Sequence, residues 1–250
     1  MLIKGQKNKI YISLGICMFI YFFVSAIFVK ILMVNNFWIN KTDITTENIG
    51  KAIFNQSISS IIIPALCFLP FWKNYKLLKR GKVRYYLIAA AFAFYIISFC
   101  MQENITFIMK YNFFKYLLFI GLGEEIVFRG IMYNVIKLES NRKAILISGA
   151  CFGVMHALSI YWNGGNTSAI IMGAVSELGG GILAGGYFIF LYEISGTIFL
   201  PVLIHAILDY PYGKQSTDIY FTVILTIYCM VLLFINTYMK KLRKGKKTDI

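Results

Sequence analysis

Residues 117–130 read Leu117-Leu118-Phe119-Ile120-Gly121-Leu122-Gly123-Glu124-Glu125-Ile126-Val127-Phe128-Arg129-Gly130. They lie in a longer run, 113–136, that has the length of a membrane-spanning helix, which takes about 20 mostly apolar residues. Three side chains within six positions of this stretch are nevertheless ionisable. A charge at the centre of a membrane helix costs about 2.5–3.5 kcal/mol on insertion scales, so intramembrane charge is functional by default. The stretch therefore predicts a membrane helix that carries a functional site.

The composition of the whole chain supports this interpretation. Its 250 residues are 58% hydrophobic and only 14% charged, with a mean hydropathy of +0.68. Soluble domains carry about 25% charged residues, and one water-facing globule has no room to bury so many apolar side chains. The composition excludes a soluble enzyme, a disordered chain and a disulfide-stapled secreted domain. It predicts an all-α integral membrane protein, built as a polytopic helical bundle.

Hydropathy along the chain predicts eight membrane spans, with seven as the alternative count. The sixth is rich in glycine, and Gly181 and Gly185 have the spacing of a close helix-packing motif. The seventh is short and contains Pro201, so either span is expected to be tilted, broken or partly buried in the bundle. No linker, soluble domain or internal repeat interrupts the series, so residues 1–250 are expected to form a single membrane domain. The predicted spans are 10–34, 52–72, 85–101, 113–136, 144–162, 170–192, 197–211 and 219–239.

The basic residues, which give a formal net charge of +14, predict an orientation. Of the 25 Lys and Arg residues, 18 fall in 1–9, 73–84, 137–143 and 240–250, and only four fall in the loops between them. By the positive-inside rule this split places both termini in the cytoplasm. Basic runs between apolar segments are typical of contact with anionic lipid and not of a nucleic-acid-binding face. The lipid bilayer is therefore an expected partner, and nucleic acid is not.

Cysteine usage and the N-terminus add two further expectations. The five cysteines lie inside apolar runs without any CxxC pair, so we expect small buried hydrophobic residues and not disulfides or zinc ligands. The uncharged run from Ile10 to Val29 follows a basic stretch, as in a signal peptide. It is longer than the about 7–15 residues of a signal h-region, so an uncleaved first span is expected.

The ionisable groups of 117–130 differ in their local surroundings. Glu125 and Arg129 are four residues apart on one helix face, in the order that favours an intrahelical ion pair. Glu124 is turned about 100° away and has no such local partner. A buried ion pair that only orients helices would explain Glu125 and Arg129. It would leave Glu124 unexplained, because a second carboxylate only adds desolvation cost.

Both histidines of the chain lie in apolar segments. His156 follows Phe152 by four residues, and His205 precedes Asp209 by four. A lone histidine in an apolar helix is more often a satisfied core residue, but no histidine is used elsewhere in this sequence. Two histidines, two glutamates and an aspartate on three helices are able to converge in a bundle. Such a group suits either metal coordination or the acid–base activation of water.

The three short motifs together resemble those of the CPBP intramembrane proteases, also called the Abi or CAAX-protease family. The family signature is Glu-Glu-x-x-x-Arg, Phe-x-x-x-His and His-x-x-x-Asn/Asp on separate helices. The chain has them in that order, and the resemblance covers a catalytic core of about 113–212. They occur as Glu124-Glu125-x-x-x-Arg129, Phe152-x-x-x-His156 and His205-x-x-x-Asp209.

The resemblance implies an intramembrane endopeptidase that acts on a hydrophobic or membrane-associated peptide or protein. The family includes the eukaryotic endoprotease that removes the last three residues of prenylated CAAX proteins. Its bacterial members are linked to bacteriocin immunity and to peptide maturation, which suggests a bacterial plasma membrane for this chain.

Carried over by motif, the resemblance also implies catalytic roles. Glu124 and His156 would position and deprotonate a water, while Glu125 and Arg129 would hold the geometry. His205, with Asp209, would stabilise the oxyanion of the tetrahedral intermediate. Asp209 stands where the eukaryotic enzymes have Asn, so it is expected to be protonated, to hold one tautomer of His205 or to ligate a metal. Metalloprotease and glutamate-dependent mechanisms are both held for the family, so a divalent metal such as zinc stays an open alternative.

Two other function classes fit parts of the sequence. An ion- or proton-coupled transporter would also place Glu, Asp and His within the membrane, but it predicts broken helices and charge in both halves of the chain. A non-catalytic immunity or scaffold protein of the same fold would need none of the motif residues, all of which are present. We therefore rank both classes below a protease.

Overall fold

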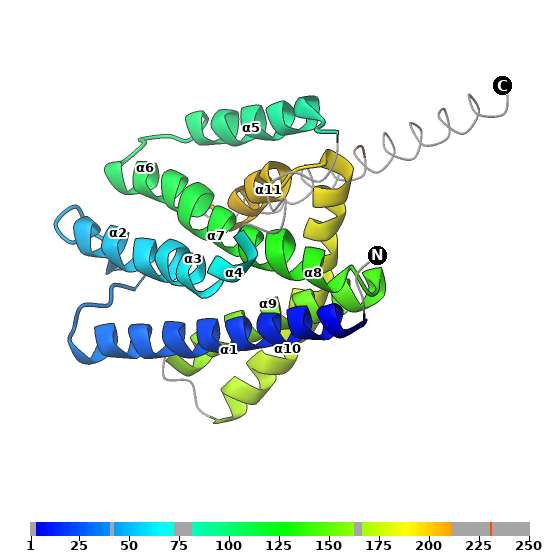
Figure 1. Ribbon diagram of the computed structural model, residues 1–250. Helices are drawn as coiled ribbons and strands as arrows, with labels where there is room; N and C mark the ends of the chain where they lie inside the picture. The colour runs from blue at the N-terminus through cyan, green and yellow to red at the C-terminus, as the bar shows by residue number, and fades with distance from the viewer. Residues whose placement is uncertain (1–3, 41–42, 73–81, 163–166, 212–230, 232–250) are drawn as a thin grey trace, which may run out of the picture.

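The computed structural model describes residues 4–40, 43–72, 82–162, 167–211 and 231. These residues form helices joined by turns and contain no β-strand. Successive segments run back and forth between two ends of a bundle (Figure 1). The all-α class expected from the composition is confirmed. The predicted eighth span, 219–239, lies outside the described residues apart from position 231.

The first half of the bundle consists of α1, a composite segment and α5. The composite segment contains a short π-helix, η2, whose turns hold more residues than α-helical turns. The elements are α1 (Lys4–Val34), α2 (Ile49–Ser57), η2 (Ile58–Ile62), α3 (Ile63–Cys67), α4 (Leu69–Trp72) and α5 (Tyr85–Cys100).

The second half begins with a longer composite segment, Phe107–Ile136, which contains the motif glutamates. Thr106 caps its start, because the threonine Oγ1 accepts a hydrogen bond from the backbone N–H of Met109 at 3.2 Å. Two π-helices flank the short α-helical turn that carries Glu124 and Glu125. The elements are α6 (Phe107–Phe114), η3 (Lys115–Gly121), α7 (Leu122–Glu125), η4 (Ile126–Tyr133), α8 (Asn134–Ile136), α9 (Asn141–Trp162), α10 (Thr167–Ser195) and α11 (Phe199–Asp209).

Three of the described helices are long and apolar enough to cross a membrane: Asn8–Val34, Ile49–Cys67 and Thr167–Ser195. Together with the composition, they support an integral membrane protein. The predicted spans 85–101 and 197–211 form shorter helices, of 16 and 11 residues. Residues 200–207 of α11 are all buried, so this segment lies inside the bundle, as its proline and short length suggested. The count of eight spans stays a prediction.

One end of the bundle gathers basic residues from segments far apart in sequence. The backbone N–H of Arg84 donates to the carbonyl of Ser195 at 2.9 Å, and Nζ of Lys137 lies 3.0 Å from Oε1 of Glu193. Gly196 permits this approach, since it has a φ of +73° and a Cβ there would sit 2.6 Å from the carbonyl oxygen of Lys82. The start of α1 and α8 lie at the same end (Figure 1).

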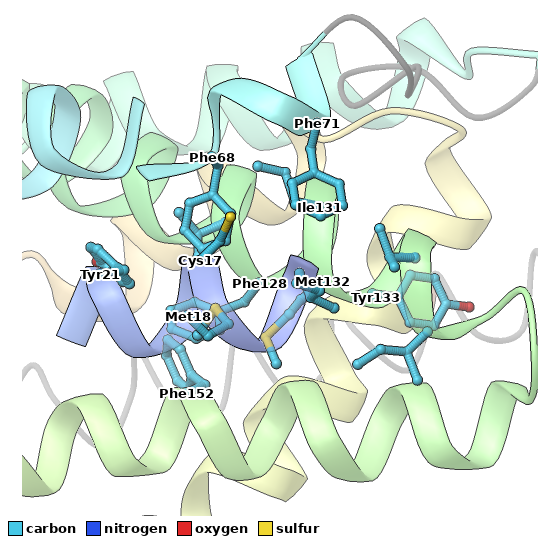
Figure 2. Close-up of a cluster of buried hydrophobic side chains, with 14 of the residues drawn as sticks. Cys17, Met18, Tyr21, Phe68, Phe71, Phe128, Ile131, Met132, Tyr133 and Phe152 are labelled. Carbon is cyan, nitrogen blue, oxygen red and sulfur yellow. The ribbon is translucent and has the colours of Figure 1, made fainter. Parts of the chain in front are cut away.

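The largest apolar core cluster joins α1 to both composite segments and to α9. In Figure 2, Met18 and Cys17 of α1 face Phe68, Phe128 and Phe152, which come from three different segments. A second cluster packs α5 and α11 against η3 and the C-terminal half of α10. The composite segment Phe107–Ile136 contributes to both clusters, so it is held on several sides at once.

Glycines bring α9 and α10 into direct backbone contact, as the Gly181-x-x-x-Gly185 spacing predicted. A Cβ on Gly181 would sit 2.5 Å from the backbone nitrogen of Gly153, and one on Gly185 would sit 2.8 Å from Cα of Gly149. Gly179 and Gly180 face open space, so only part of the glycine-rich run packs as expected.

The cysteine expectation also needs a correction. The described cysteines are all free, but Cys100 is exposed on α5, and only Cys17 is fully buried.

Candidate active site

Two glycines let the neighbours of α7 approach the motif glutamates. A Cβ on Gly123 would sit 2.3 Å from the carbonyl oxygen of Ser60 in η2. A Cβ on Gly121 would sit 2.9 Å from the carbonyl oxygen of Val202 in α11. The backbone that carries Glu124 and Glu125 is therefore pressed against η2 on one side and α11 on the other.

Glu125 and Arg129 form the ion pair that their spacing predicted. Nη1 of Arg129 lies 3.0 Å from Oε1 of Glu125, and both side chains are fully buried. The pair lacks the alignment of a hydrogen bond, and the guanidinium nitrogens have no hydrogen-bond partner among the described residues. The guanidinium instead lies over the rings of Phe152, at 4.4 Å, and Phe188, at 4.9 Å. Ring faces attract a cation in this geometry, so the aromatic contacts partly replace hydrogen bonds.

His205 lies among all three motif carboxylates. Its Nδ1 is 2.9 Å from Oε1 of Glu125. Its Nε2 is 3.4 Å from Oδ2 of Asp209 and 3.7 Å from Oε2 of Glu124. The imidazole also stacks on Phe188, with ring centroids 4.9 Å apart and planes 20° from parallel. α11 thus brings His205 against the two glutamates of α7.

His156 is oriented by its own motif. Nδ1 of His156 lies 3.1 Å from the carbonyl oxygen of Phe152, one turn earlier in α9. With the proton on Nδ1, this bond leaves the lone pair on Nε2, which sets the tautomer. Glu124 is within electrostatic reach of His156 as well as of His205 and Asp209. The Phe of the motif therefore does two things: its carbonyl orients His156, and its ring covers Arg129.

Glu124 differs from Glu125 in that it borders open space. It lines a cavity of about 130 Å³ between α1, η2 and α9, together with Tyr21, Ser25, Ser60 and Met155. Its Oε2 atom is buried without a hydrogen-bond partner among the described residues. A buried, unpartnered carboxylate oxygen beside a cavity of this size is suited to bind water.

Carboxylates outnumber the cationic groups among the described residues of the site. Glu124, Glu125 and Asp209 lie around the imidazole of His205, and Arg129 pairs with Glu125. Like charges close together cost free energy, so a hydrogen-bond or proton donor beside these carboxylates stabilises the site. The Glu124 side chain lines the cavity, so we expect such a donor to meet Glu124.

No group of three or more His, Cys, Asp and Glu side chains in the described part of the chain has the arrangement of a metal site. The donors around His205 are instead turned toward the imidazole and toward Arg129. As placed, they do not fit a metal ion, and no metal ligand is assigned.

The structure brings Glu124, Glu125, Arg129, His205 and Asp209 into one cluster, with His156 beside Glu124. The sequence did not point to Phe188, which stacks on both His205 and Arg129, or to Tyr21 and Ser25 of α1. These residues lie in uninterrupted apolar runs, and no local pattern distinguishes them from other core residues.

A comparison with family models matches residues 109–211 to the model described as type II CAAX prenyl endopeptidase Rce1-like. The match confirms the resemblance expected from the motifs, and it contains all six candidate residues. No curated protein and no solved structure matches the chain. Residues 109–211 are therefore similar to the Rce1-like endopeptidases of the CPBP family.

Proposed function

We propose that this chain is an intramembrane endopeptidase that cleaves a hydrophobic or membrane-associated peptide. The observation that carries the proposal is the position of Glu124. The Glu124 side chain lines the cavity, and its buried Oε2 has no described hydrogen-bond partner and lies 3.7 Å from Nε2 of His205. A general base needs this combination of an available acceptor, room for water and a charged neighbour.

In the proposed reaction, a water in the cavity attacks the scissile carbonyl carbon as Glu124 takes its proton. The proton neutralises the excess carboxylate charge of the site, which lowers the free energy of the state that follows the transfer. His156, with its Nε2 lone pair set by the bond to Phe152, is a second acceptor for the same water. A positioned base contributes about 10²–10⁴-fold to such a reaction.

In this proposal, His205 and Asp209 stabilise the oxyanion of the tetrahedral intermediate. In its imidazolium form, His205 donates from Nδ1 to Glu125 and presents Nε2–H on the side of Glu124 and Asp209. Positive charge and a donor at that place stabilise the negative oxygen of the tetrahedral intermediate. Glu125 and Arg129 do not touch the substrate, and they hold the imidazole in place. The breakdown step returns the proton from Glu124 to the leaving amine.

The proposed substrate is already held by the membrane. The family match carries the name of a CAAX prenyl endopeptidase, so a prenylated peptide with a C-terminal CAAX sequence is the first probe. We also propose cytoplasmic termini. The basic residues Lys82, Arg84 and Lys137 lie at the same end of the bundle as the start of α1, as a cytoplasmic face requires.

The direct test replaces Glu124 by Gln in the full chain, reconstituted in lipid vesicles. Release of the C-terminal tripeptide from a farnesylated CAAX peptide is followed by mass spectrometry. We expect Glu124→Gln to lower kcat by about 10²–10⁴-fold, since it removes the base and keeps the shape of the side chain. The melting temperature in detergent should stay that of the wild type.

The matched control is Glu193→Gln, the same change in a carboxylate that pairs with Lys137 at the end of the bundle. It should keep wild-type activity. Cleavage by Glu124→Gln at the wild-type rate would reject Glu124 as the base. A wild type that cleaves neither this peptide nor another membrane-anchored one would instead favour the non-catalytic alternative.

A further inference from the structure

Ser25 of α1 borders the same cavity as Glu124, although it lies outside the matched segment 109–211. The serine is 2% exposed, and its Oγ has no hydrogen-bond partner among the described residues. Oε2 of Glu124 is likewise buried and has no hydrogen-bond partner among the described residues. Leaving a buried polar atom unsatisfied costs about 1–3 kcal/mol. Two residues that line one cavity and each carry a buried, unpartnered oxygen indicate a shared polar occupant.

Three serines of the neighbouring segment 49–67 have hydrogen-bonded hydroxyls. Ser57 donates to the carbonyl of Ile53 at 2.7 Å, and Ser59 donates to that of Asn55 at 2.8 Å, in each case four residues earlier. Ser60, which also lines the cavity, accepts a hydrogen bond from Gln56 at 2.6 Å. Ser25 makes no such bond, so its hydroxyl keeps its hydrogen-bonding capacity for the cavity.

The cavity is large enough to hold that occupant as water. A single buried water needs about 10–15 Å³ of such space and two to four polar partners. The volume here is about 130 Å³, so one water or a short chain of waters fits between the two side chains.

We propose that Ser25 is a positioning residue that holds the hydrolytic water against Glu124. The proposal rests on the proposed function. Glu124 Oε2 accepts one hydrogen of the water, and Ser25 Oγ accepts the other, directly or through a second water. With both hydrogens fixed, the lone pair of the water points to the substrate carbonyl. Ser25 forms no covalent bond and takes no proton.

The kinetic test compares two variants of equal shape, Ser25→Val and Ser25→Thr, because only threonine keeps the hydroxyl. In vesicles with the farnesylated CAAX peptide, Ser25→Val should lower kcat by about tenfold, as expected for one lost hydrogen bond to the attacking water. KM should stay unchanged, and Ser25→Thr should restore kcat. Ser148→Ala, which removes another buried and unpartnered hydroxyl outside the cavity, should have wild-type kcat. Equal kcat for the valine and threonine variants would overturn the proposal.

A second measurement needs no proteolysis. X-ray radiolysis of bound water produces hydroxyl radicals that oxidise adjacent side chains. Tyr21 lines the cavity and is 3% exposed, whereas Tyr95 is fully buried and does not line it. We expect oxidation of Tyr21, little of Tyr95, and less of Tyr21 in Ser25→Val than in Ser25→Thr.

The two measurements separate the possible failures. An inactive wild type with labelled Tyr21 would reject the proposed function and keep the bound water. An active wild type in which Tyr21 is labelled no faster than Tyr95 would reject the water site and keep the protease.

Discussion

At the scale of single residues, Arg129 shows how the site keeps a charge inside the bundle. Its guanidinium is fully buried and forms an ion pair with Glu125, while Phe152 and Phe188 cover it. Removing one member of a buried pair leaves the other uncompensated, whereas removing both is far less costly. The stability of the motif helix should therefore depend on the pair and not on either residue alone.

Arg129→Met tests this dependence. We expect it to lower the free energy of unfolding by about 3–5 kcal/mol, because the buried Glu125 loses the guanidinium and keeps only the contact with His205. The double variant Glu125→Gln, Arg129→Met should recover part of that loss. Thermal unfolding in detergent measures both. Lys143→Met, which breaks the Glu139–Lys143 pair of the surface, is the control and should change nothing measurable. Equal losses of stability in Arg129→Met and Lys143→Met would contradict the interpretation.

The residue scale is also where the sequence was most informative about the site. The Glu125–Arg129 pair and the closeness of His205 to Asp209 follow from a spacing of four residues on a helix. The contact between His205 and Glu125 joins segments 80 residues apart, and no local spacing predicts it. The roles of Phe188 and Ser25 were likewise not predictable from local sequence, because they depend on which helix each side chain faces.

At the scale of elements, the site depends on segments that are held at fixed distances. α9 carries Phe152 and His156, α10 carries Phe188, and glycines set the distance between the two helices. The spacing of Gly181 and Gly185 made this contact predictable. The π-helices η3 and η4 around Glu124 and Glu125 were not predictable, because an α-helix and a π-helix with the same apolar residues look alike in sequence. π-Turns are frequent at functional sites, and here they flank the motif.

Gly153→Ala tests the packing of α9 on α10. Its Cβ would sit 2.2 Å from the carbonyl oxygen of Glu177, so the helices must move apart. We expect a lower melting temperature, and reduced activity because Phe152 and His156 shift with α9. Gly179→Ala is the matched control. Its Cβ meets open space, and alanine favours a helix over glycine by about 1 kcal/mol, so the melting temperature should stay or rise. A Gly153→Ala protein as stable as the wild type would show that the contact is not restrictive.

At the scale of the whole molecule, composition predicted the helical class and the membrane setting. Hydropathy alone does not distinguish a lipid-facing helix from a core helix, so the burial of α11 was predictable only from its proline and its short length. The structure places the cavity beside Glu124, in a bundle whose exposed helix faces are largely apolar. A polar peptide would have to leave water to reach this cavity, and each backbone group left unpaired would cost a few kcal/mol. A peptide that is already in the membrane meets less of this barrier.

The most direct measurement is therefore the cleavage of one CAAX peptide sequence by the wild-type chain in lipid vesicles, with and without its farnesyl group. Mass spectrometry of the released tripeptide gives kcat/KM for both forms. A membrane-embedded protease should cleave the farnesylated form at least about tenfold more efficiently, since about 1.4 kcal/mol of avoided desolvation is a factor of ten. Equal values of kcat/KM for the two forms would contradict an active site that receives its substrate from the membrane.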